Sequence, residues 1–224
     1  MAHYEIEIKS LLGSKENAEN LVKKMSKSDP SCARVATSKQ LNHYFEGGNI
    51  EMLLQKTKHL FDEEELKKFK SIVEKGKDFS VRTRQKDDEV LLVVKASLDA
   101  GTSANTVSRL EFEETADATL DELDALVHDA GFTYQAKWSR EREEYAYKGV
   151  NVCLDKNAGY GFLAEFERVA EDGSDIDAIR RELEGLMAEL GVEALPQDRL
   201  ERMFAHYNTH WPEYYGTDKT FTIE

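Results

Sequence analysis

The first residues of the chain place two acids and a lysine at alternate positions. Glu5, Glu7 and Lys9 are separated by Ile6 and Ile8. Because side chains alternate across a β-strand, the charged groups share one face and the isoleucines share the other. Such a face is costly inside an apolar core, but it suits a polar cavity that binds ions.

The same arrangement recurs in later alternating segments, where charged residues share a face opposite apolar ones. A single charged strand face is usually the solvated side of an antiparallel sheet. Here, however, charged faces of mixed sign recur on several strands, which favours a binding site. The basic members are Lys9, Arg82, Arg84, Lys95, Arg109, Arg140 and Arg142, and the acidic members are Glu5, Glu7, Glu111, Glu113, Glu165 and Glu167.

The chemistry of this set is that of a site for a phosphate and a metal. Apolar helix stripes need apolar strand faces as partners, so helices outside a barrel would turn the charged faces inward. Buried charges are costly unless they have partners or ligands. Arginine forks match phosphate oxygens, and carboxylates suit hard cations such as Mg²⁺ or Mn²⁺. One ligand satisfies both groups, namely a metal-chelated oligophosphate.

Eight segments alternate with a period of two, as strands do. Tight turns at 86–89, 148–149 and 157–161 connect several of them. We therefore predict an α+β fold, an eight-stranded antiparallel β-barrel with helices packed outside. The predicted strands are 3–9, 38–46, 79–86, 89–97, 105–114, 132–147, 150–155 and 161–168.

Helical patterns lie between and after these strands. Ser14 is a candidate cap for a helix at 15–27, and Thr119 opens a capping box for a helix that ends near Ala130. An apolar stripe runs from Ile176 to Leu190, Pro196 opens a last helix through Phe204, and the tail 209–224 shows no clear period. We assign one domain to 1–224, with a core at about 3–190, a helical insertion at 46–77, and a C-terminal helix and tail at 195–224.

The composition limits the partners of the protein. The net charge is −14 at pH 7, which disfavours general binding to nucleic acids or anionic membranes. Cys32 and Cys153 have neither metal-motif spacing nor a disulfide framework, which favours a reducing compartment. Because no signal peptide or membrane-spanning run is visible, we expect a cytoplasmic monomer or homodimer without nucleic-acid or membrane partners.

These residues resemble the CYTH family, also called triphosphate tunnel metalloenzymes. Glu5-Ile6-Glu7-Ile8-Lys9 matches the family's N-terminal Glu-x-Glu-x-Lys signature. The sequence departs from the family pattern at Asn42, where the family often has Asp. Further matches follow in order over about residues 3–190, at 40–45, 81–84, 94–95, 109–113, 140–145, 153–155 and 162–167.

The resemblance implies a tunnel-forming barrel of eight antiparallel strands with helices outside. Family members include inorganic triphosphatases, thiamine triphosphatases and class IV adenylyl cyclases, which bind a triphosphate through basic residues and a divalent metal through acidic ones. The metal ligands that it implies are Glu5, Glu7, Asp155, Glu165 and Glu167, with Glu111 and Glu113 holding a second metal or orienting water.

The leading hypothesis is hydrolysis of a triphosphate-containing small molecule, inorganic or organic, with Mg²⁺ or Mn²⁺ as the cofactor. Water would attack the terminal phosphorus. Lys9 is a candidate water activator, because a lysine among many cations should lose its proton more easily, and Tyr44 is a candidate helper. Simple phosphate binding by Lys9 and packing by Tyr44 stay open.

Two other functions stay open. A class IV adenylyl cyclase would hold ATP with the same residues, and the ribose 3′-hydroxyl would attack the innermost phosphorus. A non-catalytic triphosphate-binding module would gain nothing from inward carboxylates without a metal. Two histidine signals carry less weight, since His206 and His210 are interpreted as a surface pair and His43 is predicted on the strand face opposite Tyr44.

Overall fold

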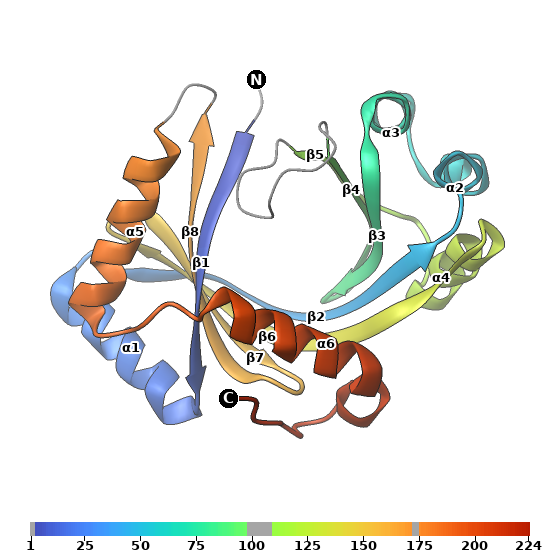
Figure 1. The fold of residues 1–224 in the computed structure, drawn as a ribbon. Helices are drawn as coiled ribbons and strands as arrows, with labels where there is room; N and C mark the ends of the chain where they lie inside the picture. The colour runs from blue at the N-terminus through green and yellow to red at the C-terminus, as the bar shows by residue number, and fades with distance from the viewer. Residues whose placement is uncertain (1–2, 98–108, 172–174) are drawn as a thin grey trace. The chain divides into compact units, whose positions relative to one another are not determined.

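The computed structural model describes residues 3–97, 109–171 and 175–224, and the side chains within 6–97, 110–169 and 175–224. The strands are β1 His3–Gly13, β2 Ala33–Gly47, β3 Lys77–Lys86, β4 Glu89–Ser97, β5 Arg109–Thr115, β6 Phe132–Tyr147, β7 Val150–Asn157 and β8 Gly161–Glu171 (Figure 1). The helices are α1 Lys15–Ser28, α2 Ile50–Thr57, α3 Glu63–Lys75, α4 Leu120–Asp129, α5 Ile176–Leu190 and α6 Gln197–Tyr214, and Lys58–Leu60 forms the 3-10 turn η1.

Hydrogen bonds join the strands in the order β1-β8-β7-β6-β2-β3-β4-β5, and the described pairs are antiparallel. The predicted α+β fold with eight antiparallel strands is confirmed. Strand β2 begins at Ala33 rather than at residue 38. Its first five residues are all exposed, so this part of the strand has no alternation of buried and exposed residues from which the sequence could predict it. Strand β5 is described from Arg109 onward, and residues 105–108 of the predicted strand lie outside the described residues.

The chain divides into two compact units, each with its own apolar core. Unit 1 consists of Met1–Lys39 and Ser139–Glu224, and unit 2 consists of Gln40–Trp138. The assignment of the whole chain to one domain stays a prediction.

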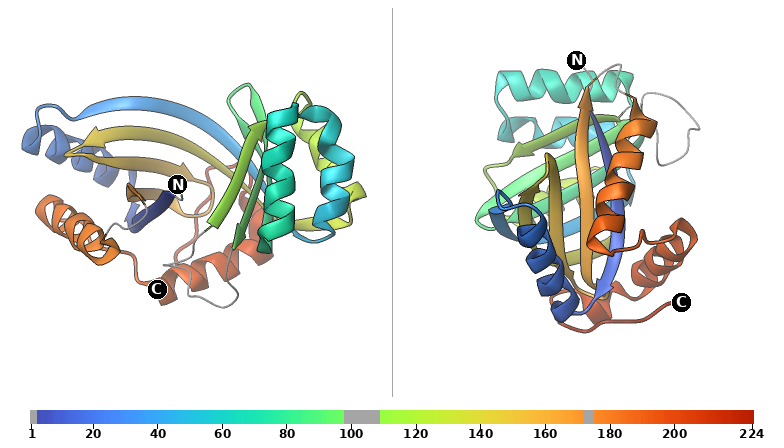
Figure 2. Two further views of the ribbon diagram at one scale, coloured as in Figure 1. Left: turned by 90° about the horizontal axis from the view of Figure 1, so that it is seen from above. Right: turned by 90° about the vertical axis from the view of Figure 1, so that its left-hand side faces the viewer.

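In unit 1, helices α1 and α5 cover the apolar face of β1 and β8 (Figure 1 and Figure 2). Ile6 of β1 and Phe166 of β8 are buried, as the alternation predicts. Leu183 and Leu190 of α5 come from the predicted apolar stripe and complete this core. The charged residues of the same strands therefore lie on the opposite face of the sheet.

Helix α6 is longer than the sequence predicts. We expected a helix through Phe204 and an irregular tail after it, but α6 continues through Pro212 to Tyr214. Aromatic packing explains the difference, because the ring of Tyr214 contacts Phe221 of the tail at 5.3 Å and stacks near Tyr207 at 6.0 Å. These contacts stabilise the last turn although proline lacks the amide hydrogen that a helix interior uses.

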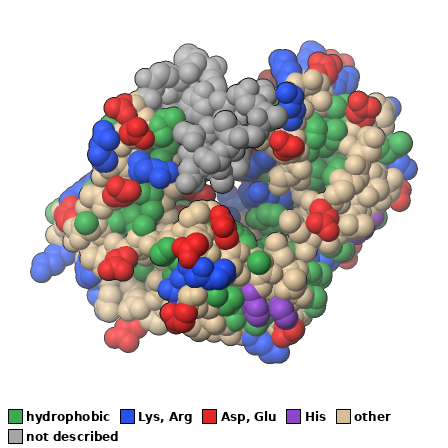
Figure 3. Space-filling view, in the orientation of Figure 1, with side chains coloured by type: hydrophobic (Ala, Val, Ile, Leu, Met, Phe, Trp, Pro, Cys, Tyr) green, Lys and Arg blue, Asp and Glu red, His purple; other side chains and the backbone are tan. Residues whose placement is uncertain are grey.

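The two histidines of α6 form a partly exposed pair. The rings of His206 and His210 stack at 4.3 Å, and Figure 3 shows histidine side chains together over the part of this face where α6 runs in Figure 1. Within the described part of the chain, no third metal-ligating side chain joins them. The interpretation as a surface pair therefore agrees with the structure.

In unit 2, helices α2, α3 and α4 pack with the apolar face of β3, β4 and β5 around one core, and Figure 2 shows α2 and α3 alongside these strands. Most of the predicted insertion 46–77 forms α2, η1 and α3. Phe112 of β5 stacks on Phe69 of α3 at 4.7 Å and meets Phe61 edge-on at 5.1 Å. This packing leaves the opposite face of the unit 2 strands to their polar residues.

A buried polar network lies within the core side of unit 2. The Asp124 carboxylate accepts hydrogen bonds from Thr83 Oγ1 at 2.5 Å and from the Tyr134 hydroxyl at 2.6 Å, and it pairs with His43 Nδ1 at 2.6 Å. Burial alone would raise the pKa of Asp124, but these partners outweigh it and lower the pKa. His43 therefore lies on the strand face opposite Tyr44, as predicted.

Helices in the described ranges are too short or too polar to cross a membrane. Figure 3 shows acidic and basic side chains interspersed over the visible face rather than gathered by sign. The surface in this view therefore offers no broad basic patch to a polyanion.

Candidate functional site

Strand register brings the charged residues of unit 1 onto one face of the sheet. On β1 and β8, Glu7 lies opposite Glu167 and Lys9 lies opposite Glu165. On β7, Cys153 is the other neighbour of Glu165. Strand β6 adds Arg142 and Arg140, opposite Asp155 and Asn157 of β7. The face that the sequence predicts for these strands is therefore formed.

The Lys9 ammonium lies between two carboxylates. Its Nζ atom is 2.9 Å from Glu7 Oε1 and 2.8 Å from Glu165 Oε1. Burial of the amine would lower its pKa, but the Glu165 and Glu7 charges outweigh burial and raise the pKa of Lys9. The sequence led us to expect that Lys9 loses its proton more easily than an ordinary lysine. This expectation is wrong, because the nearest charged neighbours of Lys9 among the described residues are acids rather than cations.

Glu165 is a buried acid of this face. Its residue is 8% exposed, and its second oxygen, Oε2, lies 2.5 Å from Arg142 Nη2. Burial would raise the pKa of Glu165, but Lys9, Arg142 and Arg140 lower it to about 2. Glu165 therefore joins the lysine and the arginines in one ion chain that runs from Glu7 to Arg142.

Asp155 holds the two arginines of β6. Its carboxylate accepts from Arg142 Nε at 2.7 Å, from Arg142 Nη2 at 2.6 Å and from Arg140 Nη1 at 3.1 Å. Asp155 is only 1% exposed. Burial would lower the pKa of Arg142, but Asp155 and Glu165 outweigh it and raise the pKa. Both guanidinium groups are thus fixed in direction.

Cys153 is the residue of this face to which the sequence assigned no role. The side chain is fully buried, and its Sγ atom accepts from Asn151 Nδ2 at 3.4 Å. Burial, together with the nearby Glu167, raises the pKa of the Cys153 thiol, although Arg142 acts in the opposite direction. The signal in the sequence is its position at an alternate site between Asn151 and Asp155.

Unit 2 carries a second charged face. Register places Tyr44 opposite Arg82 and Asn42 opposite Arg84. Arg84 donates from Nε to Asn42 Oδ1 at 2.7 Å and from Nη1 to Glu113 Oε1 at 2.6 Å. The Arg82 guanidinium lies 4.4 Å from the centre of the Tyr44 ring. Asn42, which departs from the family pattern, is therefore an arginine partner here.

The remaining members of the unit 2 face are Lys95, Glu111 and an aromatic neighbour. Lys95 Nζ lies 2.8 Å from Glu111 Oε1, on paired positions of β4 and β5. Trp138 contacts Tyr44 with ring centres 6.4 Å apart. The predicted residues thus form one group in each unit, and the side chains of Glu5 and Arg109 lie outside the described residues.

The unit 1 face fits a hard divalent cation. Glu7, Glu165 and Glu167 supply carboxylate oxygens, the donors that Mg²⁺ and Mn²⁺ prefer. The Lys9 ammonium already occupies the space between Glu7 and Glu165, which shows that this space accepts positive charge. The donor set is therefore appropriate to the cation that the sequence predicts.

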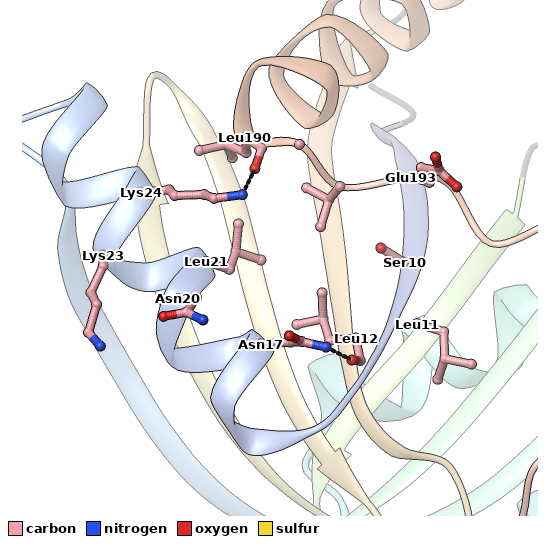
Figure 4. Close-up of a pocket in the computed structure, with 12 residues that line it drawn as sticks. Ser10, Leu11, Leu12, Asn17, Asn20, Leu21, Lys23, Lys24, Leu190 and Glu193 are labelled. Atoms are coloured by element: carbon pink, nitrogen blue, oxygen red, sulfur yellow. Dashed lines mark hydrogen bonds between the residues drawn. The ribbon is translucent and has the colours of Figure 1, made fainter.

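A pocket of about 560 Å³ lies away from this charged face, between α1, the end of β1 and the segment after α5 (Figure 4). Lys24 Nζ donates to the Leu190 carbonyl at 2.6 Å, and Asn17 Nδ2 donates to the Leu12 carbonyl at 2.7 Å. These side chains tie α1 to the chain around it. We assign the pocket no part in the chemistry of the charged face.

Comparison with protein-family models matches residues 3–199 to the CYTH domain. The chain belongs to the CYTH family. This family includes triphosphatases and adenylyl cyclases, and its triphosphate tunnel enzymes depend on divalent metals. The predicted family resemblance is confirmed.

Solved structures share the fold of this CYTH protein at low sequence identity. A conserved hypothetical protein from Pyrococcus furiosus has a TM-score of 0.60 and 17% identity, over 88% of this chain and 99% of that one. The PH1819 protein from Pyrococcus horikoshii OT3 has a TM-score of 0.58 and 20% identity, over 91% and 99%. A putative adenylate cyclase from Vibrio parahaemolyticus has a TM-score of 0.58 and 12% identity, over 92% and 99%. At these identities the likeness shows the fold alone, and comparison with curated proteins gave no match.

Proposed function

We propose that this CYTH protein hydrolyses a triphosphate-containing small molecule with the help of Mg²⁺ or Mn²⁺. The observation that carries the proposal is the ion chain Glu7–Lys9–Glu165–Arg142, in which acids and bases alternate at 2.5 to 2.9 Å on one sheet face. Such a chain holds cation ligands and phosphate ligands side by side, and a metal-chelated triphosphate needs both.

The acids of the chain would hold the cation. Among the described side chains, the proposed ligands are Glu7, Glu165 and Glu167. We add Glu5 because it is the first glutamate of the Glu-x-Glu-x-Lys signature. A bound divalent cation supplies positive charge that stabilises the phosphate oxygens during the reaction. Lys9 then exchanges its carboxylate contacts for phosphate oxygens, so we assign it phosphate binding rather than water activation.

The arginines of unit 1 would bind phosphate oxygens directly. Asp155 fixes Arg140 and Arg142 before substrate arrives, so little reorganisation is needed when negative charge develops. Both Asp155 oxygens accept from arginines, whereas one Glu165 oxygen pairs with Lys9, which would move to phosphate. We therefore assign Asp155 to orienting the arginines rather than to the metal ligation that the sequence predicts.

The unit 2 face carries further residues that the family pattern assigns to triphosphate binding. Arg84 is held by Asn42 and Glu113, and Lys95 by Glu111. We assign Arg82, Arg84 and Lys95 to phosphate binding and Tyr44 to holding the Arg82 side chain. Glu111 and Glu113 serve as the acidic partners of Lys95 and Arg84. The proposed reaction therefore does not need the second metal ion that the sequence analysis considered for these two acids.

The test is a product assay on the purified protein. Tripolyphosphate, thiamine triphosphate and ATP are each incubated with Mg²⁺ or Mn²⁺, and orthophosphate, pyrophosphate and cyclic AMP are measured. We expect orthophosphate, its loss on addition of a chelator, and its return when the cation is restored. Cyclic AMP with pyrophosphate would establish a cyclase, and binding without any product would establish a non-catalytic module; either result contradicts the proposal.

A further inference from the structure

Cys153 is a buried thiol on the charged face of unit 1. It is fully buried on β7, with Glu165 opposite it on β8. Its neighbours at alternate positions, Asn151 and Asp155, are polar. The other cysteine of the chain, Cys32, is partly exposed and packs beside the apolar core instead. Cys153 therefore belongs to the polar site and not to the core.

Cys153 and two acids are close enough to bind one ion. The Sγ atom of Cys153 and one carboxylate oxygen each of Glu165 and Glu167 all lie within 4.8 Å of one another. Zinc binds sulfur at about 2.3 Å and carboxylate oxygen at about 2.0–2.2 Å, so small side-chain rotations bring the three atoms around one cation. In the described part of the chain this is the one such group of three.

The hydrogen bonds around the thiol leave its proton without an acceptor. Asn151 Nδ2 donates to Cys153 Sγ at 3.4 Å and to Glu167 Oε1 at 2.5 Å, so one amide fixes both side chains. Among the described residues, no atom accepts from the Cys153 S–H group. A thiol is only a weak donor, so a metal–sulfur bond can replace its S–H group without the loss of a strong hydrogen bond.

Sulfur changes the kind of cation that this group selects. Magnesium prefers hard oxygen donors, whereas zinc and cadmium bind thiolate together with carboxylate. We propose that Cys153, Glu165 and Glu167 form a binding site for a thiophilic divalent cation of the zinc class. On binding, the metal–sulfur bond forms as the S–H bond breaks, the proton leaves to solvent, and the metal keeps its oxidation state.

The site has a consequence for turnover, and that consequence rests on the proposed function. Glu165 and Glu167 are also the ligands that we assign to Mg²⁺ or Mn²⁺. A zinc ion held by the same carboxylates therefore excludes the hard cation and inhibits hydrolysis. The binding itself does not depend on any activity and is tested without substrate.

Cadmium provides a direct readout, because a cadmium–thiolate bond has an ultraviolet charge-transfer band that carboxylates do not produce. The chain has two cysteines, so in Cys32→Ser protein Cys153 is the only thiol. We expect metal-free wild type and Cys32→Ser to develop the band with an end point at one cadmium per chain. Absence of the band from folded Cys32→Ser overturns the proposal.

The matching variants are Cys153→Ser and Cys153→Ala, with folding checked by circular dichroism. Both should lose the band, and its persistence in either folded variant overturns the proposal. Glu165→Gln and Glu167→Gln should keep the band but bind cadmium at least about tenfold more weakly. Unchanged affinity in both glutamine variants would show that Cys153 binds cadmium without them and would overturn the three-ligand site.

A zinc titration of the hydrolysis assay separates this proposal from the proposed function. We expect Cys153→Ser to need at least about tenfold more zinc for half inhibition than Cys32→Ser. If the cadmium band is present and no hydrolysis occurs under any condition, the proposed function fails and the cation site stands. If hydrolysis occurs and the band is absent, the cation site fails alone.

Discussion

Lys9 and Glu165 are paired across β1 and β8, with 2.8 Å between the Lys9 ammonium and Glu165 Oε1. Glu7 lies on the other side of the same ammonium, at 2.9 Å. The two acids differ in environment, since the Glu7 side chain is 44% exposed and the Glu165 side chain is 11% exposed. Because of this difference in exposure, we expect the two acids to contribute unequally to the free energy of unfolding, although both are proposed cation ligands.

The first prediction compares Glu7→Gln with Glu165→Gln. Both should reduce metal-dependent hydrolysis by about a hundredfold or more, because each removes a proposed cation ligand. Glu165→Gln should also lower the free energy of unfolding by about 3 kcal/mol, since it leaves Lys9 and Arg142 short of a buried partner. Glu7→Gln should change the free energy of unfolding by less than about 1 kcal/mol, as exposed ion pairs do.

Urea unfolding of the metal-free proteins and steady-state kinetics measure the two effects. Glu193→Gln, on the exposed segment after α5, is the control and should match wild type in both. Full activity in Glu7→Gln would contradict the cation assignment. Equal loss of stability in the two variants would contradict the inference drawn from their burial.

The second prediction concerns Asp155→Asn. If Asp155 orients Arg140 and Arg142, the variant should raise the KM for the triphosphate by about tenfold or more, because the guanidinium groups lose their fixed direction. The metal concentration that gives half-maximal activity should stay near that of wild type. If Asp155 is a metal ligand, the opposite pattern is expected, with a higher metal requirement at an unchanged KM. Titrations of substrate and metal on the same preparation distinguish the two roles.

The third prediction concerns unit 2. Arg84 makes separate contacts to Asn42 and Glu113, a geometry that one ammonium group cannot reproduce. Arg84→Lys should therefore raise the KM for the triphosphate by about tenfold although the charge is kept. Lys67→Gln, on the exposed side of α3, removes a charge and should leave the KM unchanged. A wild-type KM in Arg84→Lys would show that Arg84 acts only as a positive charge.

The alternation of residues was sufficient to predict most of the fold and the composition of the charged faces. It placed Arg84 on a polar face and His43 on the face opposite Tyr44, because side-chain direction in a strand follows residue parity. It did not predict the partners of those residues. Asp155 was expected to bind metal, and only the register of β6 against β7 shows that it faces Arg142.

The same limit explains the wrong expectation about Lys9. The sequence contains several cations on the same faces, so a low pKa for Lys9 was expected, but the pKa depends on which groups are nearest. Strand pairing places Glu165 opposite Lys9, and Glu7 lies two residues before it on the same face. The length of α6 was missed for a similar reason, because the contact of Tyr214 with Phe221 depends on tertiary packing.

The last prediction follows from the pKa of Glu165. Its carboxyl has an ordinary pKa of 4.5 and a pKa of about 2 in the folded protein, where Lys9 and Arg142 stabilise the charged form against burial. Because the pKa of Glu165 is lower in the folded than in the unfolded state, its ionised carboxylate adds to the free energy of unfolding at any pH above the unfolded-state pKa. This contribution is lost as the pH falls through the folded-state pKa. Metal-free wild type should therefore lose this contribution between about pH 5 and pH 2. Lys9, whose pKa is raised, adds stability that is lost only at alkaline pH, as the pH rises through its folded-state value.

Thermal unfolding from neutral to acidic pH tests this relation. The melting temperature of Glu165→Gln should start lower than that of wild type and fall less steeply with acid, because glutamine does not titrate. Glu193→Gln, which removes an exposed acid, should follow the wild-type slope. Parallel acid slopes in wild type and Glu165→Gln would mean that Glu165 is not held ionised by Lys9 and Arg142, and the ion chain on which the proposed function depends would lose its central member.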